Sequence, residues 1–414
     1  MSPDEVLAAT VREEWGRLVA LLLGRFRRLD LVEDALGDAV EAAARRWPAD
    51  GVPDSPAAWL HTAARRRLLD RLRAEAMAAR KAPLLVVDAE PIGGGTVMAD
   101  PGGLVEDDVL RLVLMCCHPA LGPEVASALA LRLVVGVSTA DIARLFLVPE
   151  PTMAARITRG KKKIAAAGIP FAVPAADDLP DRLRVVAQTA YLAFTAGYAP
   201  GSGPDLVRAD LAGEAVRLVR VTLALRPAEP VLVALLALTL LQHSRRDARV
   251  GPDGALVLLP DQDRARWHRD EVDEAVRLLA GLAPSTDLLT ESYRLQALVA
   301  AEHALAPTAA DTRWDRICAA YDALAVVSPS PMVRLASAVA VAERDGAAAG
   351  LAALDGLDAE LSGSHRLPAV RGELLARLGE DDAAVIALDD AIRLCGNEVE
   401  RAHLTARRDG LTTP

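Results

Sequence analysis

The sequence predicts an all-α protein of more than one domain, and three observations carry this prediction. The chain is 52% hydrophobic but only 3% aromatic, so Ala and Leu supply its core, while the β-branched runs that favour strands are few. Apolar residues recur three and four positions apart over most of the length, which is the period of an amphipathic helix. With 414 residues, the chain exceeds what one hydrophobic core holds, so two or three domains are expected.

Residues 5–80 are expected to form a compact helical unit. Within it, residues 30–41 hold five acidic residues and no basic one, on a helix that ends near Trp47 and Pro48. A short loop over residues 48–57 precedes a helix rich in arginine. The spacing of this third helix predicts that its buried side carries Trp59, Ala63 and Leu69.

Residues 82–104 are rich in Gly and Pro and lack a helical period, which predicts a flexible linker. After the linker, residues 138–163 predict two short helices joined by a tight turn. Ser138 or Thr139 can cap the first helix, and the prolines at 149 and 151 force the second helix to begin close to them. This is the layout of a helix-turn-helix.

The second helix of this motif has two distinct faces. Met153, Ile157 and Ile164 form an apolar stripe, and the segment 156–163 contains five basic residues and no acid. Such a helix fits the major groove of DNA, with side chains at its start on base edges and its basic end on phosphates. The expected contacts come from Thr152, Arg156, Arg159, Lys161 and Lys162.

The rest of the chain is expected to be helical as well. Glycine- and proline-rich breaks fall at 197–205 and 249–264, and the second break contains GPDG followed by ALVLL, which predicts a small hairpin. Past residue 310 the predicted helices shorten and pair. The segments 343–357 and 377–390 match at a separation near 34, the period of tetratricopeptide helix pairs.

Charge divides the chain in two. Residues 1–170 hold 22 basic and 22 acidic residues, so the net charge of -10 lies entirely in residues 171–414, with 25 basic and 35 acidic residues. In the neutral part the charges are segregated, because 30–41 is acidic while 61–81 holds seven bases against two acids. This pattern predicts one surface for a basic protein partner and another for DNA.

The sequence also indicates a compartment. Four cysteines without a spaced framework favour a reducing environment. The N-terminus lacks the basic start and apolar core of a signal peptide. The longest apolar run, residues 231–241, is shorter than the ~20 residues that a membrane helix needs. A cytoplasmic protein without membrane contact is expected.

No motif predicts catalysis, a cofactor or a metal. Cys116, Cys117 and His118 are adjacent, and neighbouring side chains on a helix point too far apart to converge on one ion. The charged segment 261–268 is a candidate ligand or partner site, and the alternative is a helix start capped by Asp with a Trp packed in the core. Its candidate residues are Asp261, Asp263, Arg264 and Trp267.

The order of these segments resembles the extracytoplasmic-function sigma factors of the sigma-70 family, the minimal initiation subunits of bacterial RNA polymerase. The resemblance is carried by DLVEDALGDAV (30–40), AWLHTAARRRLLDRLR (58–73) and STADIARLFLVPEPTMAARITRGKKKI (138–164). CCHPALGPE (116–124), GKKKIAAAGIPFAVP (160–174) and LLPDQDRARWHRDE (258–271) resemble the subgroup with a long C-terminal helical, tetratricopeptide-like extension.

This resemblance implies a domain order and a non-enzymatic role. Residues 1–81 would be sigma region 2, 82–104 the linker, and 105–170 the region 4 helix-turn-helix domain. Residues 171–305 would form a helical extension, and 306–414 tetratricopeptide-like repeats. The extension would act as an in-built regulator or as a docking platform for a protein or a small molecule.

The resemblance also implies partners and site residues. Core RNA polymerase would be bound through its β′ clamp helices and β flap, with Asp34, Asp38 and Glu41 facing the clamp. The helix at 150–164 would read the minus-thirty-five element of promoter DNA. The minus-ten element would be bound by Trp59, Arg65, Arg66, Arg67, Arg71 and Arg73.

Five positions depart from the pattern of that family. Gly37 stands in place of a common Gln and Val40 in place of a Phe, which affects the expected polymerase contact, and Arg66 replaces an Asn in the minus-ten helix. Pro149 replaces a capping Ser, and Gly160 inside the second helix costs about 1 kcal/mol relative to Ala. The alternative function is a helical-repeat DNA-binding regulator or adaptor that does not join polymerase.

Overall fold

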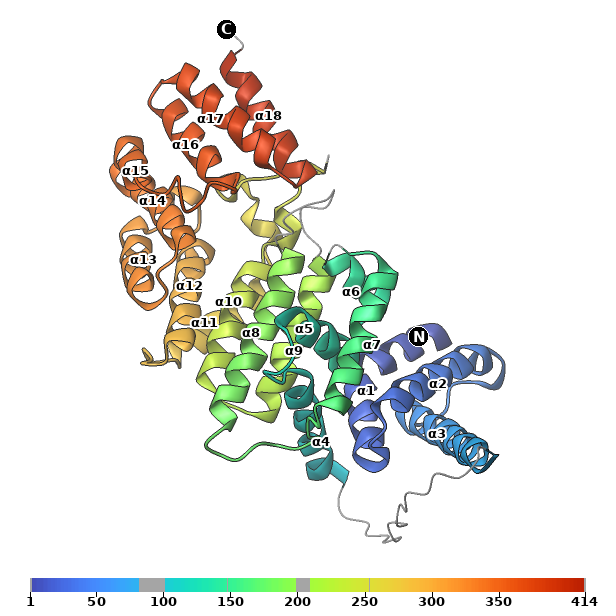
Figure 1. Cartoon of the computed structure of the whole chain (residues 1–414). Helices are drawn as coiled ribbons and strands as arrows, with labels where there is room; N and C mark the ends of the chain where they lie inside the picture. The colour runs from blue at the N-terminus through green and yellow to red at the C-terminus, as the bar shows by residue number, and fades with distance from the viewer. Residues whose placement is uncertain (1, 82–100, 147, 199–208, 253, 413–414) are drawn as a thin grey trace. The chain divides into compact units, whose positions relative to one another are not determined.

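The computed structural model describes residues 2–81, 101–146, 148–198, 209–252 and 254–412 (Figure 1). Every regular element in these ranges is a helix, so the all-α prediction is confirmed. The chain folds into two compact units: the first comprises Met1–Ile142 and Glu150–Thr189, and the second comprises Ala143–Pro149 and Ala190–Pro414. Among the described helices, none combines the length and the apolar character that a bilayer crossing requires.

The first unit begins with three long helices, α1 (Pro3–Phe26), α2 (Leu29–Asp50) and α3 (Pro56–Lys81). Ser2 and Glu5 form a reciprocal capping box at the start of α1. The buried stripe of α3 is one position away from the predicted one, because Leu60, Ala64 and Leu68 are fully buried. The predicted residues instead border this stripe.

The same unit continues with α4 (Pro101–Cys116), α5 (Pro123–Ala130) and a one-turn π-helix η1 (Leu131–Val135). Most of the predicted linker lies outside the described residues, but its last residues belong to α4, so the helix begins earlier than the sequence suggested. The predicted helix-turn-helix is formed by α6 (Thr139–Leu145) and α7 (Glu150–Ala166). Helix α8 (Leu179–Tyr198) runs from the first unit into the second.

The second unit contains α9 (Ala209–Leu225), α10 (Pro230–His243), α11 (Arg269–Ala280) and α12 (Leu288–Leu305). Helix α10 is buried almost all round, which explains its unbroken apolar sequence. Four 3-10 turns lie in the same unit: η2 (Arg246–Ala248), η3 (Leu259–Asp261), η4 (Arg264–Arg266) and η5 (Ala309–Asp311). The predicted hairpin is present as a single antiparallel bridge between Val250 and Leu256.

The C-terminal part consists of short helices that pack in pairs (Figure 1). They are α13 (Trp314–Val327), α14 (Pro331–Asp345), α15 (Ala347–Ala353), α16 (Arg366–Arg377), α17 (Asp381–Leu394) and α18 (Glu398–Thr412). Helices α15 and α17 begin at equivalent positions of the predicted period, at 347 and 381. Glu343 of α14 pairs with Arg377 of α16 at 2.6 Å, and Glu373 of α16 pairs with Arg407 of α18 at 2.8 Å, each across 34 residues.

Two glycines in the first unit are required by close packing. A Cβ added at Gly16 of α1 would lie 2.3 Å from the carbonyl oxygen of Val134 in η1. A Cβ at Gly160 of α7 would lie 2.8 Å from Cγ1 of Val125 in α5. Glycine lowers the helix propensity at position 160, but it allows α7 to approach α5 more closely than any other residue would permit.

Candidate functional site

Helix α7 has the two faces that the sequence predicted. Met153, Ile157 and Ile164 are buried against the domain, and Thr152, Arg159 and Lys162 are exposed. The other two predicted DNA contacts are engaged within the protein. Arg156 pairs with Glu124 of α5 at 2.8 Å, and Lys161 pairs with Glu33 of α2.

Glu33 is the centre of a buried ionic group that joins α2 to the helix-turn-helix part of the first unit. It is 7% exposed, and its second carboxylate oxygen accepts from Nε of Arg132 in η1 at 2.5 Å. The side chains of Arg132 and Lys161 are 22% and 18% exposed. Burial on its own would raise the pKa of Glu33, but the two cations outweigh it and hold this pKa below the usual value.

The backbone around Arg132 strengthens the same junction. The indole Nε1 of Trp15 in α1 donates to the carbonyl oxygen of Arg132 at 3.0 Å, and the Arg132 guanidinium lies 5.4 Å from the centre of the Trp15 ring. Gly136, which ends η1 with a φ of 84°, packs directly against Trp15. Arg132 of the π-helical turn η1 therefore contacts α1 through its carbonyl group and α2 through its side chain.

The acidic face of α2 meets the arginine-rich helix α3. Arg71 pairs with Asp38 at 2.8 Å and lies 3.5 Å from Asp34. The third predicted polymerase contact, Glu41, pairs with Arg45 one turn further along α2. Two residues predicted to face polymerase and one predicted to contact the minus-ten element therefore bind one another in this structure.

The remaining minus-ten candidates lie on α3 in two environments. Arg65, Arg66 and Arg67 are exposed, and Arg73 is exposed with a 3.4 Å contact to Asp70. Trp59 is partly buried, and its ring packs edge-on against Trp47 with 5.7 Å between the ring centres. A consecutive run of exposed guanidinium groups beside a partly buried indole suits phosphate contact and base stacking.

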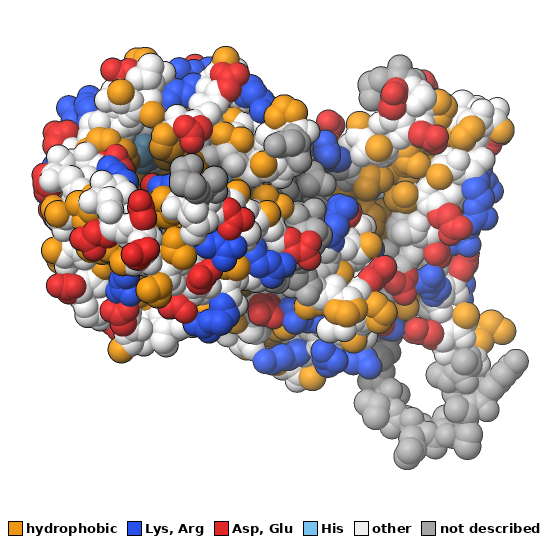
Figure 2. Space-filling view, turned by 90° about the horizontal axis from the view of Figure 1, so that it is seen from above, with side chains coloured by type: hydrophobic (Ala, Val, Ile, Leu, Met, Phe, Trp, Pro, Cys, Tyr) orange, Lys and Arg blue, Asp and Glu red, His pale blue; other side chains and the backbone are white. Residues whose placement is uncertain are grey.

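Acidic and basic residues that form separate segments of the sequence lie close together on the surface. On the described part of the face drawn in Figure 2, basic and acidic side chains are interspersed. The pairing of Arg71 with Asp38 shows how this arises, because helices of opposite charge are neighbours in the fold. Their charges partly cancel before any partner binds.

The candidate site in the extension has a structural role for most of its residues. Asp263 caps the turn η4 by accepting from the Ala265 amide at 2.9 Å, and Trp267 is buried. Arg264 stacks 4.7 Å from the Trp267 ring and donates to the carbonyl oxygen of Ala306 at 3.0 Å, at the end of α12. Asp261 is exposed. This geometry matches the alternative interpretation, a capped turn with a Trp in the core.

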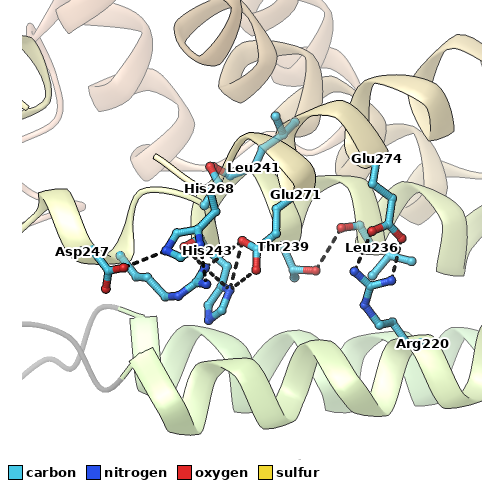
Figure 3. A network of polar contacts seen from close by, with 11 residues as sticks. Arg220, Leu236, Thr239, Leu241, His243, Asp247, His268, Glu271 and Glu274 are labelled. Carbon is cyan, nitrogen blue, oxygen red and sulfur yellow. Dashed lines mark hydrogen bonds and ion pairs between the residues drawn. The ribbon is translucent and has the colours of Figure 1, made fainter. Parts of the chain in front are cut away.

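A larger polar network lies beside that segment, between α10 and α11 (Figure 3). His243 contacts Glu271 at 3.0 Å, and Arg246 donates to Glu271 at 2.8 Å and to the ring of His268 at 3.0 Å. His268 in turn contacts Asp247 at 2.7 Å. Glu271 of α11 contacts both His243 and Arg246, so this network fixes the turn η2 against α11.

One group of side chains has ligand types that metals use. His365, Cys395 and Glu400 place their ligand atoms within 4.8 Å of one another. The His365 ring already contacts Glu400 at 3.1 Å, and the pKa of Glu400 is lowered by this bond and by the nearby Arg366 and Arg249. The surrounding positive charge opposes a bound cation, so the group is best described as a hydrogen bond between His365 and Glu400.

The four cysteines of the chain are buried, and none of them forms a disulfide in the structure described.

Sequence reasoning did not single out Glu33 or Arg132. The signal for Glu33 was present, because it is spaced to share the apolar stripe of Leu29 and Leu36, which are buried. A carboxylate on such a stripe requires a buried partner. The identity of that partner, 99 residues away, had no local signal.

Comparisons with known proteins agree with this arrangement. Residues 11–77 match the family model described as sigma-70 region 2, residues 111–164 match sigma-70, region 4, and residues 182–283 match a family of unknown function (DUF6596). An uncharacterized protein of Rhizobium meliloti (strain 1021) is 42% identical over 391 residues, which cover 94% of this chain and 92% of the relative. No solved structure matches the chain. The helix-turn-helix, the α1–α3 unit and these matches together place the chain in the sigma-70 family, as a sigma factor with a long C-terminal helical extension.

Proposed function

We propose that this sigma factor recruits core RNA polymerase to promoters from a closed state in which regions 2 and 4 hold one another. The observation that carries the proposal is the Glu33 group, since Lys161 of the recognition helix is bound to α2. A lysine that neutralises a buried carboxylate cannot at the same time neutralise a phosphate. Promoter binding through Lys161 therefore requires separation of α7 from α2.

The DNA contacts are proposed for exposed groups, and the polymerase contacts for acids of α2 that pair with Arg71 and Arg45 in this structure. Asp34, Asp38 and Glu41 would face the β′ clamp helices, with region 4 on the β flap. Helix α3 would bind the minus-ten element through its exposed arginines, and α7 would read the minus-thirty-five element through Thr152 and Arg159. In this scheme residues 1–81 and 105–170 are the two promoter-binding domains.

The extension is proposed to regulate promoter recognition through the turn of the helix-turn-helix. The segment Ala143–Pro149, which holds the end of α6 and the turn, belongs to the second unit. A Cβ at Gly197 of α8 would lie 3.0 Å from Cδ1 of Leu145 and 2.9 Å from the backbone nitrogen of Ala212 in α9. Because this packing leaves no free space, movement of α8 and α9 would be transmitted to the turn before α7.

The test is transcription in vitro with core polymerase on DNA carrying the upstream region of the protein's own gene. The wild-type chain is compared with a variant carrying Asp34→Arg and Asp38→Arg. A matched control reverses the charge of Asp389 and Asp390 of α17 by substituting arginine for each. These residues are also exposed aspartates in surface ion pairs. We expect promoter-specific transcripts and polymerase binding from wild type and control, and loss of both from the α2 variant.

Absence of transcripts and of polymerase binding from the wild-type chain would favour the alternative, a helical-repeat regulator that does not join polymerase. Transcripts that survive the α2 reversal would place the polymerase contact elsewhere. Circular dichroism of all three proteins establishes that each one is folded.

A further inference from the structure

The second unit contains a cavity of about 570 Å³. None of the residues proposed to contact promoter DNA lines it. Its lining comes from α8, α10, α12, α13, α14 and the turn before α14, with Leu259 of η3, Arg366 of α16 and Arg245 after α10. A smaller cavity of about 440 Å³ shares Leu259, His303 and Tyr321 with it. Pockets of this size hold small molecules in many proteins.

The lining of the larger cavity has an unusual charge. It includes Arg245 and Arg366, and none of the described residues that line it is an Asp or a Glu. The positive charge of the lining contrasts with the net negative charge of residues 171–414, which hold 35 acidic and 25 basic residues. The cavity is thus a cationic site inside an acidic domain.

Neither arginine forms an ion pair with a carboxylate among the described residues. Nη2 of Arg245 donates to the hydroxyl oxygen of Tyr198 at 2.6 Å, and its guanidinium lies 5.8 Å from the centre of the Trp267 ring. Arg366 lies near enough to Glu400 to lower the pKa of that carboxyl, but Glu400 contacts His365 and does not line the cavity. Because an arginine in a protein stays protonated, both arginines remain charged.

The neighbouring groups respond to this positive charge. Burial, with help from Arg245 and Arg264, lowers the pKa of His303 to about 4, so this ring is neutral at physiological pH. Burial also lowers the pKa of Arg249; Arg245 and Arg366 lower it further, while Tyr198 and Glu400 oppose this effect. Three arginines therefore lie near one another, and Glu400 balances only part of their charge.

The other lining residues supply polar and apolar contacts. Gln242, Ser292 and Gln296 offer neutral hydrogen-bonding groups, and Ser330 caps the N-terminal end of α14, where its hydroxyl accepts from the Val333 amide at 3.2 Å. The positive end of that helix dipole also favours an anion. Leu324 and the ring of Tyr321 provide an apolar wall.

We propose that this cavity binds a small organic anion, with a carboxylate or phosphate held by Arg245 and Arg366 and an apolar body against Tyr321 and Leu324. The proposal rests on the regulatory role proposed for the extension and deepens it. Its test requires no polymerase, so a failure to bind anions would be distinct from a failure to direct transcription.

The experiment is isothermal titration calorimetry on the full chain with three probes of similar size. Phenyl phosphate and phenylacetate carry the proposed anionic groups, and benzyl alcohol is the neutral counterpart. The variants Arg245→Gln and Arg366→Gln remove one cation each. Arg371→Gln on the same helix as Arg366 is the control, because Arg371 pairs with Asp358 and does not line the cavity.

We expect one-site binding of at least one anion and much weaker binding of benzyl alcohol. Loss of either cavity arginine should weaken anion binding about tenfold or more, since a charge-assisted hydrogen bond is lost, while Arg371→Gln should bind as wild type does. The proposal is overturned if neither anion binds saturably, if the neutral probe binds equally well, or if all three variants weaken binding to the same extent. Thermal unfolding of each variant shows whether it is folded.

Discussion

The substitution Glu33→Gln tests the closed state of regions 2 and 4 most directly. It keeps the shape of the side chain but leaves Arg132 and Lys161 without their common carboxylate. Breaking a fully buried ion pair by removing one partner costs about 3–5 kcal/mol. Both cations retain some exposure and can turn toward water, so we expect a loss of about 2–3 kcal/mol from the closed state.

A loss of this size raises the equilibrium constant for opening by about 30- to 150-fold, since each 1.4 kcal/mol is a factor of ten. Hydrogen–deuterium exchange with mass spectrometry measures the change at two places, the η1 segment and the facing part of α1. Protection there should fall by a similar factor, while the interior of α10 should be unaffected. Lys161→Met should have a smaller effect, because Glu33 keeps its bond to Arg132.

The control is Glu124→Gln. Glu124 also pairs with a basic residue of α7, but from α5 within the same helix-turn-helix domain, and it is largely exposed. Unchanged protection of η1 in Glu33→Gln, or an equal loss in Glu124→Gln, would refute the reasoning. Binding to duplex DNA, followed by fluorescence anisotropy at fixed salt, should be tighter for Glu33→Gln if opening precedes promoter binding.

Further predictions concern packing and pH. Gly16→Ala should destabilise the first unit by about 1–3 kcal/mol, because the added Cβ would collide with Val134. Gly37→Ala has open space around it and should stabilise α2 by up to about 1 kcal/mol. Thermal unfolding of the two variants measures both effects. Leu145→Ala should cost about 2–4 kcal/mol in denaturant unfolding and change promoter output without changing polymerase binding. The pKa of His303 is about 4 in the folded protein, against an ordinary value near 6.5 in the unfolded chain. The free energy of unfolding should therefore fall by at most about 3 kcal/mol as the pH drops from 6.5 to 4. His303→Gln should remove this pH dependence from denaturation curves measured at several pH values.

The sequence was sufficient for features that depend on local periodicity. Helix α7 begins at Glu150 because Pro149 and Pro151 cannot lie in a helix interior, and its apolar stripe is buried as its spacing predicts. The bridge at Val250 and Leu256 likewise follows from the turn residues between them. In each case the deciding residues are neighbours in the chain.

Features that depend on distant residues were not predictable in this way. The spacing of α3 predicts Trp59, Ala63 and Leu69 on its buried side, whereas Leu60, Ala64 and Leu68 are buried and Trp59 packs edge-on against Trp47 of α2. Lys161 is predicted to contact DNA, but it pairs with Glu33, which lies 128 residues earlier. The cavity at Arg245 and Arg366 joins segments separated by more than a hundred residues, so no window of sequence contains it.

The two ion pairs between α14, α16 and α18 place the same repeat position of neighbouring units opposite each other, with Glu343 facing Arg377 and Glu373 facing Arg407. An identical copy of one repeat, stacked on itself, would bring two glutamates or two arginines together at these positions. Like charges at such a distance repel, so exact duplication is disfavoured by the geometry of the stack. An engineered extra repeat is therefore expected to be more stable with opposite charges than with like charges at both positions, by up to about 1 kcal/mol for each partly exposed pair.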